Sequence, residues 1–430
     1  MSVAVDQAAL EPGEPERSAP GWRSAWPGTL TLIVCALTPV VGYLGNLGFA
    51  PLVALAGLGC LPLALRDRRP NLGLIALLLL TAWALVSTLW SVGDPPHPDF
   101  RSYKAIEQFT AIKLAPQFAL YSAFVVGAFG VSGRAGGRAT LVLGVGLLAV
   151  GAVFLFDGAF GAPVYNGLRR LGGHPAQRAD VALRDLSRTA YVLALFFWPA
   201  ALRLDQAGWR IVAGALALAT VGGAVFLGSD APIAALIVST AVFLAVRFAG
   251  RPALLAMLAG VVVYFLAAPA LIALLDHPGL LNSATPNRFQ SWAIRLDIWR
   301  FAADRIAERP FFGWGLDASR TFSPSIPLHT HDAALQIWLE LGVVGAAIVC
   351  LFWTWLILQL DRLEARDRPL AAACAAAASA YLTIGAMSFG VWQEWWLALG
   401  ALTAVVCTAL DAARRGRIGA QATTTQPAPP

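Results

Sequence analysis

Long apolar stretches alternate with short polar connections along most of the chain. About twelve of them approach the roughly 20 residues that an α-helix needs to cross a bilayer. They lie near residues 29–46, 47–65, 71–91, 108–130, 139–157, 189–204, 209–228, 231–248, 252–275, 334–359, 370–388 and 392–411. Glycine and proline occur inside several stretches, but such residues are tolerated in membrane helices. The pattern predicts an all-α integral membrane protein with about twelve transmembrane helices.

The composition agrees with insertion into a membrane. Hydrophobic residues make up 58% of the 430-residue chain and charged residues 13%, whereas a soluble protein carries charge on about a quarter of its residues. These proportions exclude a disordered, collagen-like or ordinary soluble protein. All the cysteines fall inside apolar stretches, so we interpret them as small buried hydrophobes and not as disulfides or metal ligands. They are Cys35, Cys60, Cys350, Cys374 and Cys407.

The positive charges fall in alternate connections between the stretches. A net charge of +6 can indicate a nucleic-acid partner, but here the arginines cluster in connections that would share one side of a membrane. Examples are Arg66 to Arg69, Arg247 with Arg251, and Arg414 to Arg417. Cytoplasmic connections are enriched in such residues, so we place both termini in the cytoplasm. We expect membrane lipids, and no nucleic acid, as partners.

The remaining connections would face the outer side, and two of them are long. They run from about 157 to 188 and from about 276 to 333, and loops of the second length are usually functional. The predicted organisation is a disordered cytoplasmic tail over 1–28, without a cleavable signal peptide, and helices 1–9 over 29–275. A large outer loop follows over 276–333, on the periplasmic side if the cell is Gram-negative, then helices 10–12 over 334–411 and a cytoplasmic tail over 412–430.

The large loop contains a candidate amphipathic helix. Trp292, Arg295, Ile298 or Trp299, and Ala302 recur at helical spacing, which is typical of a helix near the membrane surface. All basic residues of this loop are arginine, and the guanidinium group suits bidentate phosphate binding. The alternative is an interfacial helix with Arg and Trp anchors and internal ion pairs.

Two histidines lie where this loop re-enters the membrane. Histidine suits general-base chemistry near neutral pH, and the alternative is that one histidine caps the following helix while the other packs. We favour this structural role for His329. A zinc site is the competing reading, but Asp332 is too local to complete its ligand set. Glu340 follows about two turns into the next span, where a carboxylate marks function or a buried partner.

Two further polar positions lie at outer membrane boundaries. Arg188 begins a span, where an arginine routinely extends to the membrane surface. Asp230 follows Ser229 at the start of another span, where a helix N-cap is the routine explanation. On these residues alone, the structural and functional readings both stay open.

Three motifs occupy about sixty residues of the second half of the chain. They are Arg288-x-x-x-Trp292, Arg309-Pro310-Phe311-Phe312-Gly313-Trp314-Gly315 and His329-Thr330-His331-Asp332-x-x-Leu335-Gln336-x-Trp338-x-Glu340-x-Gly342-x-x-Gly345. Together they resemble the O-antigen ligase and polymerase family of bacterial membrane glycosyltransferases. The layout is similar too, with about twelve spans and one large outer loop before the last three.

The resemblance implies an enzyme of the bacterial inner membrane. Such enzymes take a glycan from an undecaprenyl-diphosphate carrier at the periplasmic face and pass it to an acceptor hydroxyl. Ligases use lipid A-core as acceptor, and polymerases use another carrier-linked repeat unit. By this resemblance His331 matches the histidine that activates the acceptor, and Arg288 matches an arginine that holds the diphosphate. We predict both as catalytic residues.

The sequence departs from the family pattern at two positions. Asp332 stands where many members have asparagine, and Asp230 stands where many have an arginine after serine. Arg188 is our candidate for a substitute, because it too precedes a span at the outer boundary. The predicted substrate-binding residues are therefore Arg188, Arg295, Asp332, Glu340 and Trp292.

The chemistry of the donor requires no metal or other cofactor. Diphosphate is a good leaving group, so arginines to bind it and a base to activate the acceptor suffice. Ligase and polymerase are not separated by the sequence, although length and a single large loop favour a ligase. A lipid-glycan transporter and a non-catalytic lipid-binding scaffold are the alternatives from other classes.

Overall fold

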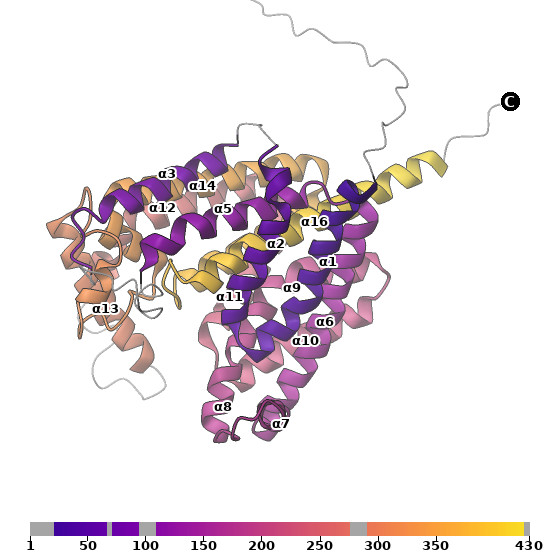
Figure 1. Cartoon of the computed structure of the whole chain (residues 1–430), viewed down its shortest axis with the longest axis horizontal. Coiled ribbons are helices and arrows are strands. Elements are labelled where there is room, and N and C mark those ends of the chain that lie inside the picture. Colours follow the sequence, from indigo (N-terminus) through magenta and orange to yellow (C-terminus); the bar gives the residue numbers. More distant parts are fainter. Residues whose placement is uncertain (1–20, 67–70, 94–108, 276–289, 425–430) are drawn as a thin grey trace, which may run out of the picture.

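The structure, a computed structural model, describes residues 21–66, 71–93, 109–275 and 290–424. Within these ranges all the regular elements are helices, so the predicted all-α fold is confirmed (Figure 1). Of the tail predicted over 1–28, residues 1–20 lie outside the described residues, as does Arg288, whereas residues 21–28 belong to α1. The Arg66–Arg69 connection is described only as far as Arg66.

Each predicted apolar stretch overlaps one helix. The helices are α1 (Gly21–Leu44), α2 (Phe49–Ala64), α3 (Leu72–Ser87), α5 (Thr110–Ala128), α6 (Gly133–Phe160), α9 (Arg188–Gln206), α10 (Arg210–Phe226), α11 (Asp230–Ala249), α12 (Arg251–Leu275), α14 (Ala333–Arg366), α15 (Arg368–Gly385) and α16 (Glu394–Thr424). Eight helices of the described chain are long and apolar enough to cross a membrane, and α3 and α10 are shorter apolar helices. The chain is therefore a multi-pass membrane protein, while the count of twelve crossings stays a prediction.

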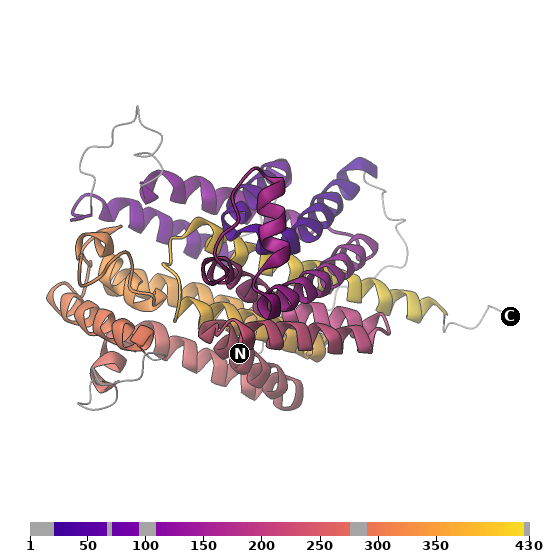
Figure 2. The same cartoon turned by 90° about the horizontal axis from the view of Figure 1, so that it is seen from below.

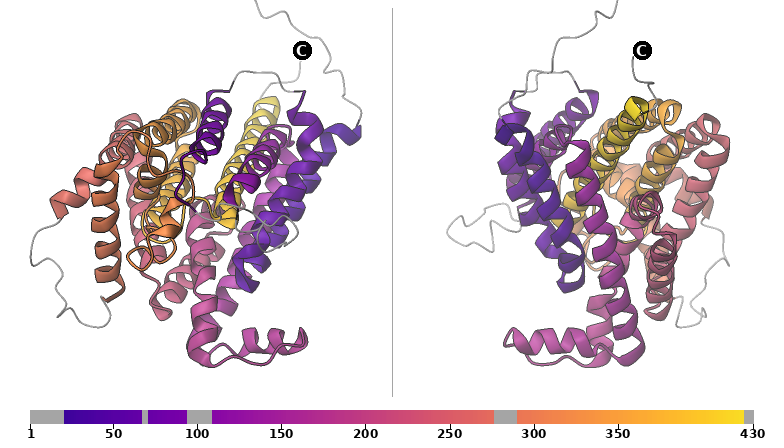
Figure 3. Two further views of the ribbon diagram at one scale, coloured as in Figure 1. Left: turned by 60° about the vertical axis from the view of Figure 1, so that its left-hand side comes forward. Right: turned by 90° about the vertical axis from the view of Figure 1, so that its right-hand side faces the viewer.

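The two long outer connections also contain helices. Residues between α6 and α9 form α7 (Pro163–Leu171) and α8 (Ala179–Leu186), which lie across the end of α6 (Figure 3). The larger connection contains α13 (Gln290–Glu308) and the short 3-10 helix η3 (Ala318–Thr321). On α13, Ile298 and Ala302 are buried and Asp297 is exposed. The amphipathic helix predicted in this loop is therefore present.

The helices pack into two adjoining groups, which the view in Figure 2 shows from below. One buried cluster is formed mainly by α1, α2, α5, α6, α9 and α16, and the other mainly by α3, α12, α13, α14 and α15. Large apolar side chains such as Ile211 and Phe248 point outward. Exposed apolar side chains on a bundle of this kind are what a lipid environment favours.

The arginine-rich ends of the helices meet at one end of the bundle. Arg251 pairs with Asp361, with an N–O distance of 3.4 Å. Arg414 pairs with Asp367, which also caps α15. The helix α13 and the turn with the two histidines lie at the opposite end (Figure 1). This separation agrees with the sidedness predicted from charge.

Helix α14 is broken at Gly342, whose backbone is left-handed in φ (64°) with an extended ψ (−165°). The Arg309–Gly315 motif fills the break and satisfies the backbone groups it frees, as burial requires. The contacts are Trp314 N–H to Leu339 O (2.8 Å), Gly315 N–H to Glu340 O (2.8 Å) and Val343 N–H to Pro310 O (2.8 Å).

Glycine is needed on both sides of this contact. A Cβ atom on Gly342 would lie 2.2 Å from the Phe311 carbonyl oxygen, and one on Gly313 would lie 2.5 Å from the Glu340 carbonyl carbon. Both glycines also have positive φ, which other residues rarely adopt. Gly313 and Gly342 therefore allow the backbone of the Arg309–Gly315 motif to pack directly on the backbone of α14. This contact fixes the large outer loop against the helix.

Candidate active site

The predicted catalytic turn immediately precedes α14 and is held by the N-cap of that helix. Asp332, and not a histidine, caps α14, because its carboxylate accepts the Leu335 N–H at 2.8 Å. The same oxygen accepts the Tyr264 hydroxyl at 3.2 Å. Burial raises the pKa of Asp332 from its usual 3.8 to about 7, against the effect of these hydrogen bonds. These contacts fit a residue that positions the turn.

His331 has a strained backbone and one well-defined ring contact. Its φ of 56° places it in the left-handed region, where a non-glycine residue stores strain that is common at functional sites. Ring Nδ1 lies 2.8 Å from the carbonyl oxygen of Ser388. A carbonyl only accepts, so Nδ1 carries the proton and Nε2 of the neutral ring keeps its lone pair. The residue as a whole is half-buried.

The charge state of His331 suits a base. Burial lowers its pKa, the hydrogen bond to Ser388 opposes this, and the charge of Arg295 lowers it further. The imidazole is therefore neutral at neutral pH and ready to accept a proton. His331 stays our prediction for the general base.

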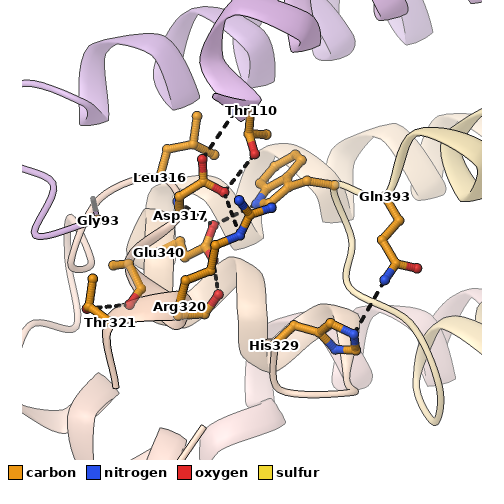
Figure 4. A network of polar contacts seen from close by, with 12 residues as sticks. Gly93, Thr110, Leu316, Asp317, Arg320, Thr321, His329, Glu340 and Gln393 are labelled. Atoms are coloured by element: carbon orange, nitrogen blue, oxygen red, sulfur yellow. Dashed lines mark hydrogen bonds and ion pairs between the residues drawn. The ribbon is translucent and has the colours of Figure 1, made fainter. Parts of the chain in front are cut away.

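His329 contacts His331 and is more deeply buried. Its Nδ1 accepts the His331 backbone N–H at 3.2 Å, and the two ring centres are 4.1 Å apart. The side chain of Gln393 faces the other ring nitrogen (Figure 4). Burial, with the nearby His331, lowers the pKa of His329 to about 3. His329 is thus a neutral supporting residue, as the expectation of a packing role requires.

Glu340 is fully buried and organises the loops around the histidine turn (Figure 4). Four groups donate hydrogen bonds to its carboxylate: Ser319 Oγ (2.6 Å), the Asp317 N–H (3.2 Å), Gln336 Nε2 (3.1 Å) and Trp392 Nε1 (2.6 Å). Such a set of donors compensates the cost of burying a carboxylate. The contacts favour a positioning role for Glu340, and its predicted contact with substrate stays a prediction.

The same network continues to the start of α5. The Asp317 carboxylate accepts the Thr110 hydroxyl at 2.7 Å and pairs with Arg320 at 3.5 Å (Figure 4). Asp317 itself has a left-handed φ of 65°. The loop of residues 313–321 is therefore tied to α5 on one side and to Glu340 on the other.

Sequence reasoning missed the connection between α15 and α16, residues 386–393. It supplies the Ser388 carbonyl to His331, the Gln393 side chain to His329 and the Trp392 indole to Glu340. Its Val391 N–H also donates to Gln336 at 2.9 Å. The predicted spans over 370–388 and 392–411 included Ser388, Trp392 and Gln393, whereas α15 ends at Gly385 and α16 begins at Glu394.

The predicted binding residues of α13 meet the start of α11. Trp292 Nε1 donates to the Asp230 carboxylate at 3.0 Å, and the Arg295 guanidinium lies 5.0 Å from the centre of the Trp292 ring. Asp230, which stands where the resemblance implies an arginine, therefore anchors the α13 tryptophan. Arg295 is held beside it by a cation–π contact.

Arg188 lies close to this group. It is exposed at the first position of α9. The charges of Arg188, Asp230 and Arg295 all act on the hydroxyl of Tyr191, one turn further along α9. Arg295 also acts on His331, where its charge lowers the pKa, and the role of Arg188 stays a prediction. Arg288 lies outside the described residues, so its predicted role stays a prediction.

Among the described residues, there is no group of three or more His, Cys, Asp or Glu side chains that could hold a metal ion. This observation leaves the predicted metal independence as a prediction. The described polar groups of the site are two histidines, a pair of arginines and buried carboxylates with hydrogen-bond donors. They can bind an anion and accept a proton.

The fold and site define a multi-pass helical membrane protein with an arginine- and histidine-bearing outer face. Residues 214–350 match the model of a protein family described as O-antigen ligase. This match covers α11 to α13, the histidine turn and the break in α14. It confirms the resemblance to the O-antigen ligase family.

Curated relatives agree with this assignment. A protein of Rickettsia conorii provisionally named a polysaccharide ligase is 35% identical over 126 residues, which cover 26% of this chain and 30% of the relative. A protein of Rickettsia typhi with the same provisional name is 34% identical over 125 residues, again 26% of this chain and 30% of the relative. The similarity thus spans less than a third of the relatives' length. No solved structure matches the chain.

Proposed function

We propose that this protein is a membrane glycosyltransferase of the O-antigen ligase type. It moves a glycan from an undecaprenyl-diphosphate carrier to an acceptor hydroxyl at the periplasmic face of the bacterial inner membrane. The proposed acceptor is lipid A-core, which makes the enzyme an O-antigen ligase. A polymerase would instead use a second carrier-linked glycan as acceptor.

The observation that best supports this proposal is the hydrogen bond from His331 Nδ1–H to the Ser388 carbonyl. It fixes the tautomer in which Nε2 accepts a proton, and it orients the ring from the α15–α16 connection. General-base catalysis needs such an oriented acceptor near the hydroxyl proton. In the proposed step the acceptor oxygen attacks the anomeric carbon, and Nε2 takes the hydroxyl proton.

The step also requires positive charge to stabilise the leaving diphosphate, and the arginines supply it. The bond between the anomeric carbon and the diphosphate oxygen breaks, and the leaving diphosphate takes the electron pair. Arg295 acts on His331, Arg188 and Arg295 both act on Tyr191, and Arg288 is expected from the motif. Guanidinium groups bind and stabilise such a charge, so the proposed reaction needs no metal and proceeds in the presence of EDTA.

The proposed sidedness follows from the two ends of the bundle. The arginine-rich end with Arg251, Arg414 and Asp367 faces the cytoplasm, as positive-inside placement requires. The loop of residues 276–333 and the histidine turn then face the periplasm. Both termini are cytoplasmic in this arrangement, and the donor glycan and its acceptor meet at the outer surface.

The test is the glycolipid profile of a strain that lacks the protein and is complemented with wild type, His331→Ala or His174→Ala. His174 is an exposed outer histidine and serves as the matched control. Loss of full-length lipopolysaccharide with accumulation of carrier-linked polymer in His331→Ala supports a ligase. Single repeat units without long chains support a polymerase. Normal glycan in His331→Ala contradicts catalysis and favours transport or a scaffold.

A further inference from the structure

Tyr191 and Ser388 form a chain of contacts that ends at the proposed base. We infer that they are positioning residues: the contact between their side chains holds the Ser388 carbonyl where it receives Nδ1–H of His331. This inference rests on the proposed role of His331 as general base. Neither residue belongs to the motifs that carry the family resemblance.

Ser388 makes both of the contacts that this role requires. Its carbonyl oxygen lies 2.8 Å from His331 Nδ1, and its hydroxyl lies 3.4 Å from the Tyr191 hydroxyl. The residue is buried, with 7% of its surface exposed. Because both contacts belong to one residue, fixing its side chain also fixes the direction of its carbonyl.

Tyr191 is a firm support for this contact. It lies in the first turn of α9, where the Thr189 hydroxyl donates to the Gly42 carbonyl of α1 at 3.2 Å. The Tyr191 ring packs on Phe389, with ring centres 4.7 Å apart. Phe389 packs in turn on Trp395, at the start of α16, with ring centres 4.5 Å apart. Tyr191 therefore contacts two consecutive residues of the α15–α16 connection from a helix anchored elsewhere in the bundle.

The position of Tyr191 also connects the two functions of the site. The charges of Arg188, Asp230 and Arg295 act on the Tyr191 hydroxyl. The charge of Arg295 also acts on His331. Tyr191 and His331 thus share Arg295 as a charge that acts on both.

The effect on the pKa of His331 has a definite sign. The groups around its ring are the Ser388 carbonyl from the α15–α16 connection, Arg295 from α13 and the neutral His329. The Asp332 carboxylate is turned toward Tyr264 and the start of α14. Among these, the hydrogen bond to Ser388 raises the pKa of His331. Loosening it lowers that pKa, so the acid limb of the rate profile moves to lower pH.

The experiment measures glycan transfer by the purified full-length protein in vesicles, with a lipid-linked donor and a soluble acceptor analogue. It compares wild type, Tyr191→Phe, Ser388→Ala, the double variant and Tyr165→Phe. Tyr191→Phe keeps the ring that packs on Phe389, and Ser388→Ala keeps the carbonyl. Tyr165 is another outer-side tyrosine and is the control. Melting temperatures of all variants report any loss of folding.

We expect each single variant to lower kcat by about two- to tenfold, the range of one neutral hydrogen bond. The donor KM stays within about twofold, and the acid limb moves to lower pH. The double variant is no slower than the slower single variant, because both changes remove one contact. Tyr165→Phe behaves as wild type.

Three outcomes overturn the inference. The first is that Tyr191→Phe has the kcat and pH profile of wild type while His331→Ala is inactive. This result supports the proposed function but contradicts the positioning role. An effect of Tyr191→Phe on donor KM alone assigns the hydroxyl to donor binding. Additive losses in the double variant show that the two side chains act separately. Activity in His331→Ala instead contradicts the proposed function itself.

Discussion

The indole nitrogen of Trp392 donates a hydrogen bond of 2.6 Å to the buried carboxylate of Glu340. The two residues belong to different elements, the α15–α16 connection and the first half of α14. The carboxylate also accepts from Ser319 of the large outer loop. One side chain therefore holds together all three segments that surround the histidine turn.

Removal of this carboxylate is expected to destabilise the protein. Glu340→Ala leaves several buried donors without an acceptor, at about 1–3 kcal/mol for each unsatisfied group. We expect a loss of about 3 kcal/mol or more in the free energy of unfolding, measured by thermal or denaturant unfolding in detergent. Glu308→Ala is the control, because its pair with Arg305 (2.5 Å) is on the surface and contributes about 1 kcal/mol or less. Equal effects of the two variants contradict the organising role of Glu340.

The rate of transfer is expected to depend on the pKa of His331. Burial lowers that pKa from its usual 6.5, and the base works only when unprotonated. Activity is therefore retained below pH 6.5 and is lost as the pH falls through the lowered pKa. In Arg295→Ala the loss of a nearby positive charge raises the pKa, which moves the acid limb to higher pH. A limb centred above pH 6.5 in wild type argues against His331 as the base.

The planar guanidinium group of Arg295 is also expected to bind the donor phosphate. Arg295→Lys keeps the charge but loses the planar fork that binds phosphate and stacks on Trp292. We expect a donor KM raised by about tenfold, the effect of one charge-assisted hydrogen bond, with a smaller change in kcat. Arg178→Lys, at an exposed outer position, is the control. An unchanged KM in Arg295→Lys removes this residue from the donor site.

Asp332→Asn is expected to preserve folding and activity. Asparagine caps a helix as well as aspartate does, so α14 keeps its N-cap. In wild type the pKa of Asp332 is raised to about 7, so the folded state holds this proton more tightly than the unfolded chain. Its contribution favours folding at low pH and is lost as the pH rises from about 4 to 7. The variant loses this pH dependence of the unfolding free energy. A large loss of transfer in Asp332→Asn would instead show that the carboxylate takes part in the reaction.

Gly342→Ala is expected to prevent correct packing of the large outer loop. The new Cβ would meet the Phe311 carbonyl at 2.2 Å, at a residue whose φ is 64°. We expect loss of transfer and a lower melting temperature. Gly260→Ala in α12 is the matched control, because no atom lies within 4 Å of its added Cβ. Alanine is the better helix former there, so this control keeps or gains stability. Wild-type behaviour of Gly342→Ala would contradict the close packing.

The helices were largely predictable because a bilayer imposes one length and one polarity on every span. The predicted stretches from 29 to 411 each overlap one helix, and the predicted helix around Trp292 and Arg295 is α13. The break at Gly342 was not predictable from hydropathy, because Leu341 and Val343 on either side of it are both apolar. It depends on a close approach between segments about thirty residues apart.

The site was predictable only where a motif or a residue type suggested chemistry. His331 was favoured and Arg188 was chosen through the family resemblance, and Arg295 was identified from helical spacing in a loop whose basic residues are arginine. Ser388 was missed because its contribution to His331 is a backbone carbonyl, which every residue possesses. Its role comes from position in space, which spacing along the chain does not reveal. The same holds for Asp230, whose contact with Trp292 joins two distant helices.

The break in α14 also changes how the site relates to the membrane. A straight helix of its 34 residues would be about 51 Å long, whereas the hydrocarbon core is about 30 Å thick. The segment after Gly342 is by itself long enough to span that core. The nine residues before it are bonded to the outer loop through the Glu340 side chain and the backbone contacts of the Arg309–Gly315 motif. The break therefore separates the part of α14 that can span the bilayer from the part that follows the histidine turn.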